Sequence, residues 1–233
     1  MFLKKNLLKI ILLAMAGGLF ANPTGSTVIA GAVDVASAGA VLTITQTTAK
    51  AIVEWSDFSI AEGETVSFAQ ASSSAAILNR VTAANPSAIY GTLEANGHVY
   101  LLNESGILVG ADGVIDTNRF VASTLALSND NFLAGGDLTF TGASSAELKN
   151  LGSISGVNDV ILIGQLVSSS GSLVASGGSV AFGGGETVIL QESGNKISVA
   201  AATVGTVESI GTITAIQAEL QAAGGNIFSL AVN

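Results

Sequence analysis

Short apolar segments separated by glycine-containing turns run along this chain, and this pattern constrains the fold more than any other feature. In the stretch that begins at Asn79, apolar runs occupy residues 88–90, 99–102, 107–109 and 114–115. The turns between them fall at Gly91, Asn96-Gly97, Ser105-Gly106 and Asp112-Gly113. This pattern is typical of closely spaced β-strands, and the glycine-containing turns interrupt any helical periodicity. The pattern predicts an all-β protein.

The turns become periodic in the second half of the chain. A unit of glycine, then serine or threonine, then an aliphatic residue begins at Gly152, Gly171 and Gly211, and Gly91 fits the same template. The first spacing is 19 residues, and we interpret the second, of 40, as two units with Gly194 between them. A strand-rich unit of about 20 residues cannot bury its own apolar side, so it must stack on copies of itself.

Stacked units of this size predict a parallel β-helix, which the crossover rule makes right-handed. The mature chain would form about ten coils at roughly 20 residues per coil. We expect continuous inward ladders that contain Ile154, Leu162, Leu173, Phe182, Leu190 and Ile213. Short strands with a turn every 8 to 12 residues also describe a β-sandwich, which is the alternative fold.

The N-terminal segment differs from the rest of the chain. Residues 1–21 carry three lysines around an apolar stretch and end at Ala21, which is typical of a secretory signal peptide. From Asn22 to about residue 70, short strands rich in Val, Ile and Thr follow. We expect Trp55 and Phe58 to lie in the core of a β cap that covers the first coil, since an open sheet edge recruits other chains.

The charge and the composition exclude several classes of function. Without the signal peptide the chain has five basic residues against 17 acidic ones, a net charge of −12, so nucleic acid is not an expected partner. There is no Cys and one His, so neither a zinc site nor a cofactor is expected. His98 follows Asn96-Gly97 and is interpreted as a solvent-facing strand residue.

We expect no enzyme and no small-molecule substrate. No nucleophile elbow is present, and a polysaccharide-acting β-helix enzyme would need clustered acids on one face. The polar candidates for such a site are scattered among turns, namely Arg80, Glu94, Glu104, Asp116 and Arg119. We interpret the two arginines as structural residues that bind turn carbonyls.

One ordered set of motifs resembles a known family. It comprises Asn79-Arg80-Val81, then Asn85-Pro86-Ser87-x-Ile89-x-Gly91, then Asn103-x-x-Gly106-Ile107, then Val121-Ala122-Ser123-Thr124-Leu125. This series is similar to the secretion domain of the filamentous haemagglutinin family, the exported partners of two-partner secretion systems. Family members usually read Asn-Pro-Asn-Gly-Ile where this chain has Asn103-Glu104-Ser105-Gly106-Ile107. The turn-forming Asn and Gly remain.

The resemblance implies a Gram-negative exoprotein whose unfolded chain is recognised by the POTRA domains of an outer-membrane β-barrel transporter and folds outside the cell. Residues 22–140 would form the secretion domain with its cap, and residues 141–233 would continue the coils to an open end. A host-cell or matrix receptor is a further expected partner, and a stand-alone surface adhesin or matrix rod is the alternative function. The residues implied in secretion are Asn79, Arg80, Asn85, Pro86, Asn103, Gly106 and Ile107, either by contacting the transporter or by shaping the fold.

Overall fold

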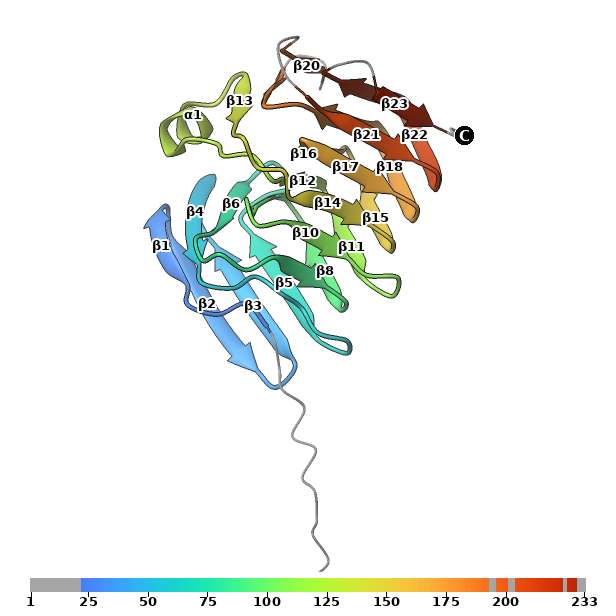
Figure 1. Cartoon of the computed structure of the whole chain (residues 1–233). Coiled ribbons are helices and arrows are strands. Elements are labelled where there is room, and N and C mark those ends of the chain that lie inside the picture. The colour runs from blue at the N-terminus through green and yellow to red at the C-terminus, as the bar shows by residue number, and fades with distance from the viewer. Residues whose placement is uncertain (1–21, 193–195, 201–203, 224–225, 230–233) are drawn as a thin grey trace, which may run out of the picture.

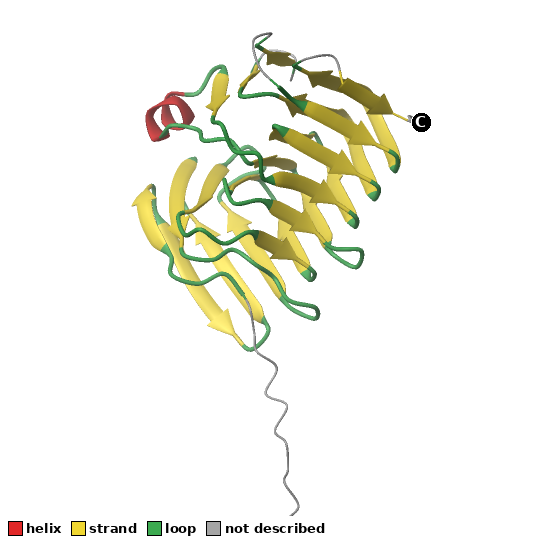
Figure 2. Ribbon diagram, in the orientation of Figure 1, coloured by secondary structure: helices red, strands yellow, loops and turns green. Residues whose placement is uncertain are grey.

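The glycine-punctuated strands stack in parallel as a β-helix with three faces (Figure 1). The computed structural model describes residues 22–192, 196–200, 204–223 and 226–229. The predicted signal peptide lies outside these residues. Figure 2 shows strands, joined by loops, from one end of the described chain to the other. This arrangement confirms the parallel β-helix and excludes the β-sandwich.

Face 1 begins in the N-terminal cap and continues through every coil. Its strands are β3 (Val41–Gln46), β5 (Thr65–Gln70), β8 (Thr92–Ala95), β11 (Val114–Thr117) and β15 (Ser153–Gly156). The first halves of two long strands, β18 (Ser172–Gly184) and β22 (Thr212–Ala222), extend it. Both long strands then bend onto face 2 and join the two faces into one 14-stranded sheet.

Face 2 carries the longer apolar strands. It consists of β4 (Lys50–Trp55), β6 (Ala76–Val81), β9 (His98–Leu102), β12 (Arg119–Ser123) and β16 (Val160–Gly164), followed by the second halves of β18 and β22. Face 3 is a separate six-stranded sheet of β7 (Ser87–Ile89), β10 (Ile107–Val109), β14 (Glu147–Asn150), β17 (Leu166–Ser169), β21 (Thr206–Ser209) and β23 (Asn226–Ser229).

The cap closes the first coil with antiparallel strands. β1 (Thr27–Ala30) pairs with β4, and β2 (Val33–Ala38) pairs with β3. Trp55 and Phe58 are 1% and 0% exposed, with their rings 5.5 Å apart in an edge-on contact. Their predicted place in the core at this end of the molecule is confirmed.

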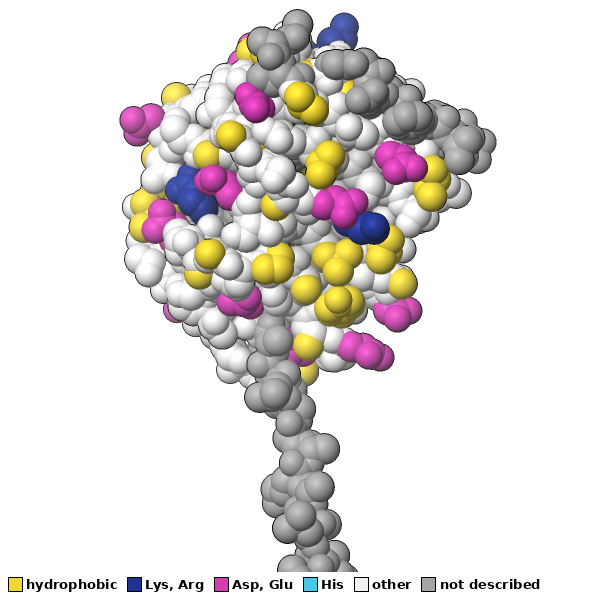
Figure 3. Space-filling model, in the orientation of Figure 1, with side chains coloured by type: hydrophobic (Ala, Val, Ile, Leu, Met, Phe, Trp, Pro, Cys, Tyr) yellow, Lys and Arg dark blue, Asp and Glu magenta, His cyan; other side chains and the backbone are white. Residues whose placement is uncertain are grey.

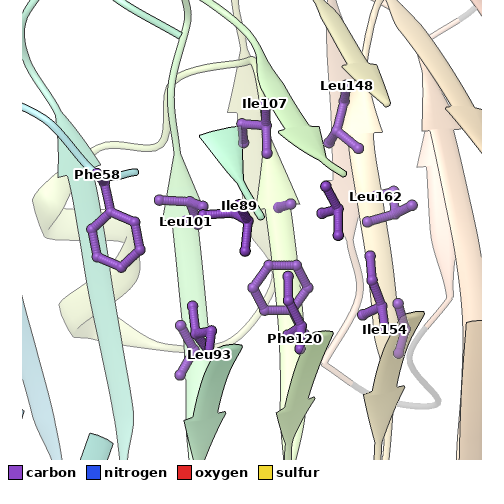
Figure 4. Packing of buried hydrophobic residues seen from close by; sticks show 14 of the residues in the cluster. Phe58, Ile89, Leu93, Leu101, Ile107, Phe120, Leu148, Ile154 and Leu162 are labelled. Carbon is purple, nitrogen blue, oxygen red and sulfur yellow. The ribbon is translucent and has the colours of Figure 1, made fainter. Parts of the chain in front are cut away.

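The interior is filled by ladders of aliphatic residues in register. One ladder on face 1 runs through Leu42, Val66, Leu93, Ile115, Ile154, Leu173 and Ile213, each of them buried. Leu162 and Phe182 are neighbours on a second ladder, on face 2. Figure 4 shows side chains from all three faces meeting in this core. Of the predicted ladder residues, five lie in this core.

Two segments leave the coils at the same corner, between face 2 and face 3. Residues 124–146 carry the helix α1 (Asn129–Ala134) and β13 (Leu138–Thr141). Residues 185–205 carry β19 (Thr187–Leu190) and β20 (Ile197–Val199), and β19 pairs antiparallel with both β13 and β20. We call these segments the first and second excursions; α1 and β13 stand beside the coils in Figure 1.

The excursions correct three expectations. The 40-residue spacing is one coil plus the second excursion, since Leu173 pairs directly with Ile213. Leu190 is buried, but in a second core between the excursions and the outer side of face 2. The described part of face 1 contains seven strands, one for each coil, whereas about ten coils were expected. The number is smaller because the excursions use residues that a uniform 20-residue repeat assigns to coils.

The second core explains the long apolar runs in the strands of face 2. Val121 and Ile161 point outward from the coils but lie under the excursions, where they are fully buried. A strand covered on both sides needs a continuous apolar run, which β9, β12 and β16 have. No helix in the described residues is long and apolar enough to cross a bilayer.

A column of glycines forms the corner between face 3 and face 1. The residue after each glycine donates a backbone hydrogen bond to the glycine carbonyl of the coil below: Ser172 to Gly152 (2.8 Å) and Thr212 to Gly171 (3.1 Å). A Cβ at Gly171 would overlap the carbonyl oxygen of Gly152. The Gly-Ser/Thr-aliphatic unit therefore marks positions where the coils touch backbone to backbone.

We expect Gly171→Ala to destabilise the protein by about 1–3 kcal/mol, because the new methyl group must push two coils apart. The midpoint of urea unfolding, followed by circular dichroism, measures the effect. Gly142→Ala is the matched control, since its Cβ would meet its nearest atom at an ordinary 3.6 Å. Equal midpoints for the two variants would refute the role of the glycine column.

Candidate functional site

Five of the seven predicted secretion residues meet at the corner between face 2 and face 3. Asn103 begins the turn from β9 to β10 and is 1% exposed. Its amide nitrogen donates to the Ser87 hydroxyl (3.0 Å) and to the Asn85 carbonyl (2.9 Å). Its side-chain oxygen accepts from the Ser105 amide at 2.9 Å. The side chain thus holds its own turn and the corner of the preceding coil together.

Gly106 closes the same turn. Its amide donates to the Asn103 carbonyl at 3.1 Å, and its carbonyl accepts from the Ser87 amide at 3.0 Å. Its φ of +115° favours glycine, and a Cβ there would lie 3.3 Å from the Glu147 carbonyl oxygen of the next coil. The retained Asn and Gly of the family pattern are therefore the residues that this turn requires.

Asn85 and Pro86 form the corner of the preceding coil. The Asn85 side chain donates to the Asp57 carboxylate, and its carbonyl receives the Asn103 amide. Pro86 is exposed and lies beside Gly106. Three successive corners are therefore bridged by side chains, from Asp57 through Asn85 to Asn103.

Ile107 lies in the hydrophobic core. It is 2% exposed and belongs to the face 3 ladder that continues through Leu148, Val167 and Val207. Figure 4 shows Ile107 and Leu148 beside each other on neighbouring strands. In the folded protein its side chain is not available to a partner.

Asn79 and Arg80 lie on β6, apart from the corner. Asn79 is fully buried, accepts from the Trp55 indole at 3.0 Å and donates to the Tyr100 carbonyl at 3.3 Å. Arg80 points to the other side of the strand, where it donates to the Leu127 carbonyl (2.6 Å) and the Asn129 side chain (2.7 Å). Arg80 therefore anchors the start of the first excursion, and it is close enough to Glu54 for an ion pair at 3.4 Å.

The residues considered for catalysis are arranged differently from the sequence expectation. Glu94 and Asp116 are neighbours in register on the outer side of face 1, whereas the sequence had placed them among scattered turns. His98 is half-buried rather than solvent-facing, and burial together with the Arg119 guanidinium lowers its pKa. In the part of the chain that the structure describes, no three acidic or histidine side chains group to hold a metal ion.

Neither the role of Ser87 nor the helix α1 was identified from the sequence. Ser87 is fully buried and binds Asn103, and its position directly after Asn85-Pro86 was the available signal. The helix α1 was also missed, although Ser128 caps it by accepting from the Asn131 amide at 3.2 Å. A serine at the cap position with an aspartate, Asp130, in the first turn is a recognisable helix start.

Comparisons with known proteins agree with this geometry. The family model described as "TPS secretion domain" matches residues 20–232. The HMW1 secretion domain from Haemophilus influenzae superposes with a TM-score of 0.77 at 30% identity, covering 86% of this chain and 57% of that one. The filamentous hemagglutinin secretion domain, 14% identical with a TM-score of 0.53, covers 89% and 100% respectively and shows the shared fold alone.

Two curated relatives are much longer proteins. Each is a heme/hemopexin-binding protein of Haemophilus influenzae, 35% identical over 119 residues in one case and 37% over 83 in the other. These matches span 49% and 36% of this chain. They span 13% and 9% of the relatives, so the chain corresponds to a small part of each.

We expect Asn103→Ala to destabilise the fold by about 1–3 kcal/mol, because it leaves the buried Ser87 hydroxyl and two backbone groups without their partner. Urea unfolding measures the change. Asn158→Ala is the control: this exposed amide makes one hydrogen bond, to Asn118, and its loss should stay within about 0.5 kcal/mol. A similar small effect for Asn103 would contradict the analysis of the corner.

We expect Glu104→Pro, which restores the family residue, to stabilise the protein by about 0.4–1 kcal/mol. Glu104 is exposed and occupies the second position of the turn, where proline restricts the unfolded chain at no cost to the turn. Ser105→Pro is the matched control and should destabilise, since the Ser105 amide donates to Asn103. If the thermal unfolding midpoints of the two variants do not move in opposite directions, Glu104 and Ser105 do not have the places in the turn that we assign to them.

Proposed function

Since the chain belongs to the TPS secretion domain family, we propose that the POTRA domains of its cognate outer-membrane transporter recognise it while it is unfolded, and that the coils form outside the cell. Proteins with such domains are exoproteins secreted across the outer membrane, to the cell surface or beyond, and this protein shares that destination. The family is one of secretion domains rather than of enzymes.

The burial of the motif carries the proposal. Asn79, Asn103 and Ile107 are 0%, 1% and 2% exposed in the folded protein. A transporter could therefore read these side chains only before the coils form. Strand addition by a POTRA domain suits an extended segment, because the main chain supplies the hydrogen bonds and alternate side chains fill pockets.

The order of contacts supports folding that follows emergence from a pore. Each coil pairs with its immediate neighbours, so a new coil can add as soon as its 20 or so residues are free. The chain has no Cys and two Pro, so neither crosslinks nor many slow isomerisations interrupt the process.

The excursions add a later closing step. β13 of the first excursion pairs with β19 of the second. The sheet that covers face 2 can therefore form only after the chain has emerged as far as Leu190. The outer side of face 2 is then buried beneath it. We propose that this second core closes after the coils between the two strands are outside.

A secretion assay tests the role of the motif. The full chain is expressed in a Gram-negative host with and without its transporter, and the amount released into the medium is measured. We expect release to need the transporter and Asn103→Ala to lower it about tenfold, as a loss of about 1.4 kcal/mol in recognition would.

Gly171→Ala separates recognition from folding, because it weakens the coils far from the motif. If both variants reduce release in proportion to their loss of stability, the motif acts by shaping the fold. If release is the same without the transporter, the two-partner proposal fails and a stand-alone adhesin or matrix rod takes its place.

A further inference from the structure

A cavity of about 220 Å³ lies between the outer side of face 2 and the two excursions. Lys50, His98, Tyr100 and Arg119 line it from the coils. Phe132 and Leu138 of the first excursion and Leu190 of the second line it from the other side. The secretion function proposed above does not use this cavity.

The coils bring nitrogen-bearing side chains together at the edge of the cavity. Lys50, Ala76, His98 and Arg119 are the first residues of four successive face 2 strands and are paired in register. The chain after residue 21 has five basic residues and one histidine against 17 acidic residues. Two of those five and the histidine line this one cavity, while Figure 3 shows acidic side chains spread over the face in view.

Two of the groups that line the cavity, Lys50 and Tyr100, have hydrogen-bonding capacity left for a ligand. Lys50 donates to the Phe132 and Leu133 carbonyls at 2.7 and 3.1 Å, which uses two of its three N–H groups. Among the described residues no carboxylate forms an ion pair with Lys50. Tyr100 is 4% exposed, and its hydroxyl makes no hydrogen bond to another described residue.

The acidic groups nearby set the orientation of such a ligand. Arg119 forms an ion pair with Asp159 at 3.4 Å, and Glu192 also lines the cavity. Burial raises the pKa of Tyr100, so its hydroxyl stays a neutral donor. Both carboxylates also act on Tyr100, so the attraction for an anion comes from Lys50, which forms no ion pair with a described carboxylate, and the neutral Tyr100 hydroxyl serves as a second donor.

We propose that this cavity binds a small organic carboxylate, with the anion at Lys50 and Tyr100 and its apolar body against Phe132, Leu138 and Leu190. The volume is below the 300–1,000 Å³ of typical ligand pockets, which limits the ligand to about the size of benzoate. Because the walls come from the coils and from both excursions, the ligand would fasten the excursions onto face 2.

Benzoate is the probe, and His98 is the reporter. As the sole histidine, His98 gives an unambiguous imidazole signal in NMR spectra of the purified protein. A bound carboxylate favours the charged imidazole, so saturating benzoate should raise the pKa of His98 and, by mass action, the thermal midpoint. Tyr100→Phe keeps the ring 5.2 Å from that of Phe132 and should weaken binding about tenfold through one lost charge-assisted hydrogen bond.

Lys149→Met is the control, since Lys149 lies on face 3 and is well exposed, and it should bind benzoate as the unchanged protein does. An unchanged pKa of His98 at saturating benzoate would overturn the proposal, and the cavity would then be a packing void. Equal binding of benzyl alcohol would also overturn it, because the neutral analogue fills the same volume without an anion. Equal binding by Tyr100→Phe would exclude the assigned orientation.

Discussion

The whole structure depends on the direct contact between the backbones of successive coils at the corner between face 3 and face 1. Glycines 113, 152, 171 and 211 lie there one above the other, with no side chain between the coils. The carbonyls of the first three accept backbone hydrogen bonds from the next coil, and the Gly211 amide donates to the Ser169 carbonyl. This contact holds the strands of faces 1 and 3 in register. The aliphatic ladders, from Leu42 to Ile213, can form because the corner allows that spacing.

At the corner between faces 2 and 3, buried amides join successive coils in addition to the backbone contact at Gly106. Asn103 binds the preceding corner through Ser87 and Asn85, and Asn150 acts similarly between faces 3 and 1, where it donates to Ser169 at 3.1 Å. A buried amide is stabilising only when its partners are in place, so these side chains make the register specific. The same burial removes the motif from the surface once the coils have formed.

The two excursions turn an exposed sheet into a double-sided core. Basic side chains do much of this work, as Arg80 binds the start of the first excursion and Lys50 binds the end of α1. Lys50 also lies 5.6 Å from the centre of the Phe132 ring. In a chain with few positive charges, two of them hold one helix against the coils, and the cavity lies beside that attachment.

Local chemistry determined the β-helix, the buried cap around Trp55, and the turn at Asn103 and Gly106, because glycine spacing and alternating apolar residues are properties of neighbouring positions in the sequence. Tertiary structure alone decided that residues 185–205 leave the coils, that Leu190 packs outside them, and that Lys50, His98 and Arg119 share a cavity. The first two outcomes depend on strand pairing between segments about 50 residues apart, such as Leu138 with Leu190. The third also needs the parallel pairing of β4, β6, β9 and β12, which places Lys50, His98 and Arg119 in register. The period in the sequence marks where coils begin, but an inserted segment of about one coil length leaves that period unchanged. Only the pairing of the strands shows whether such a segment is a coil or an excursion.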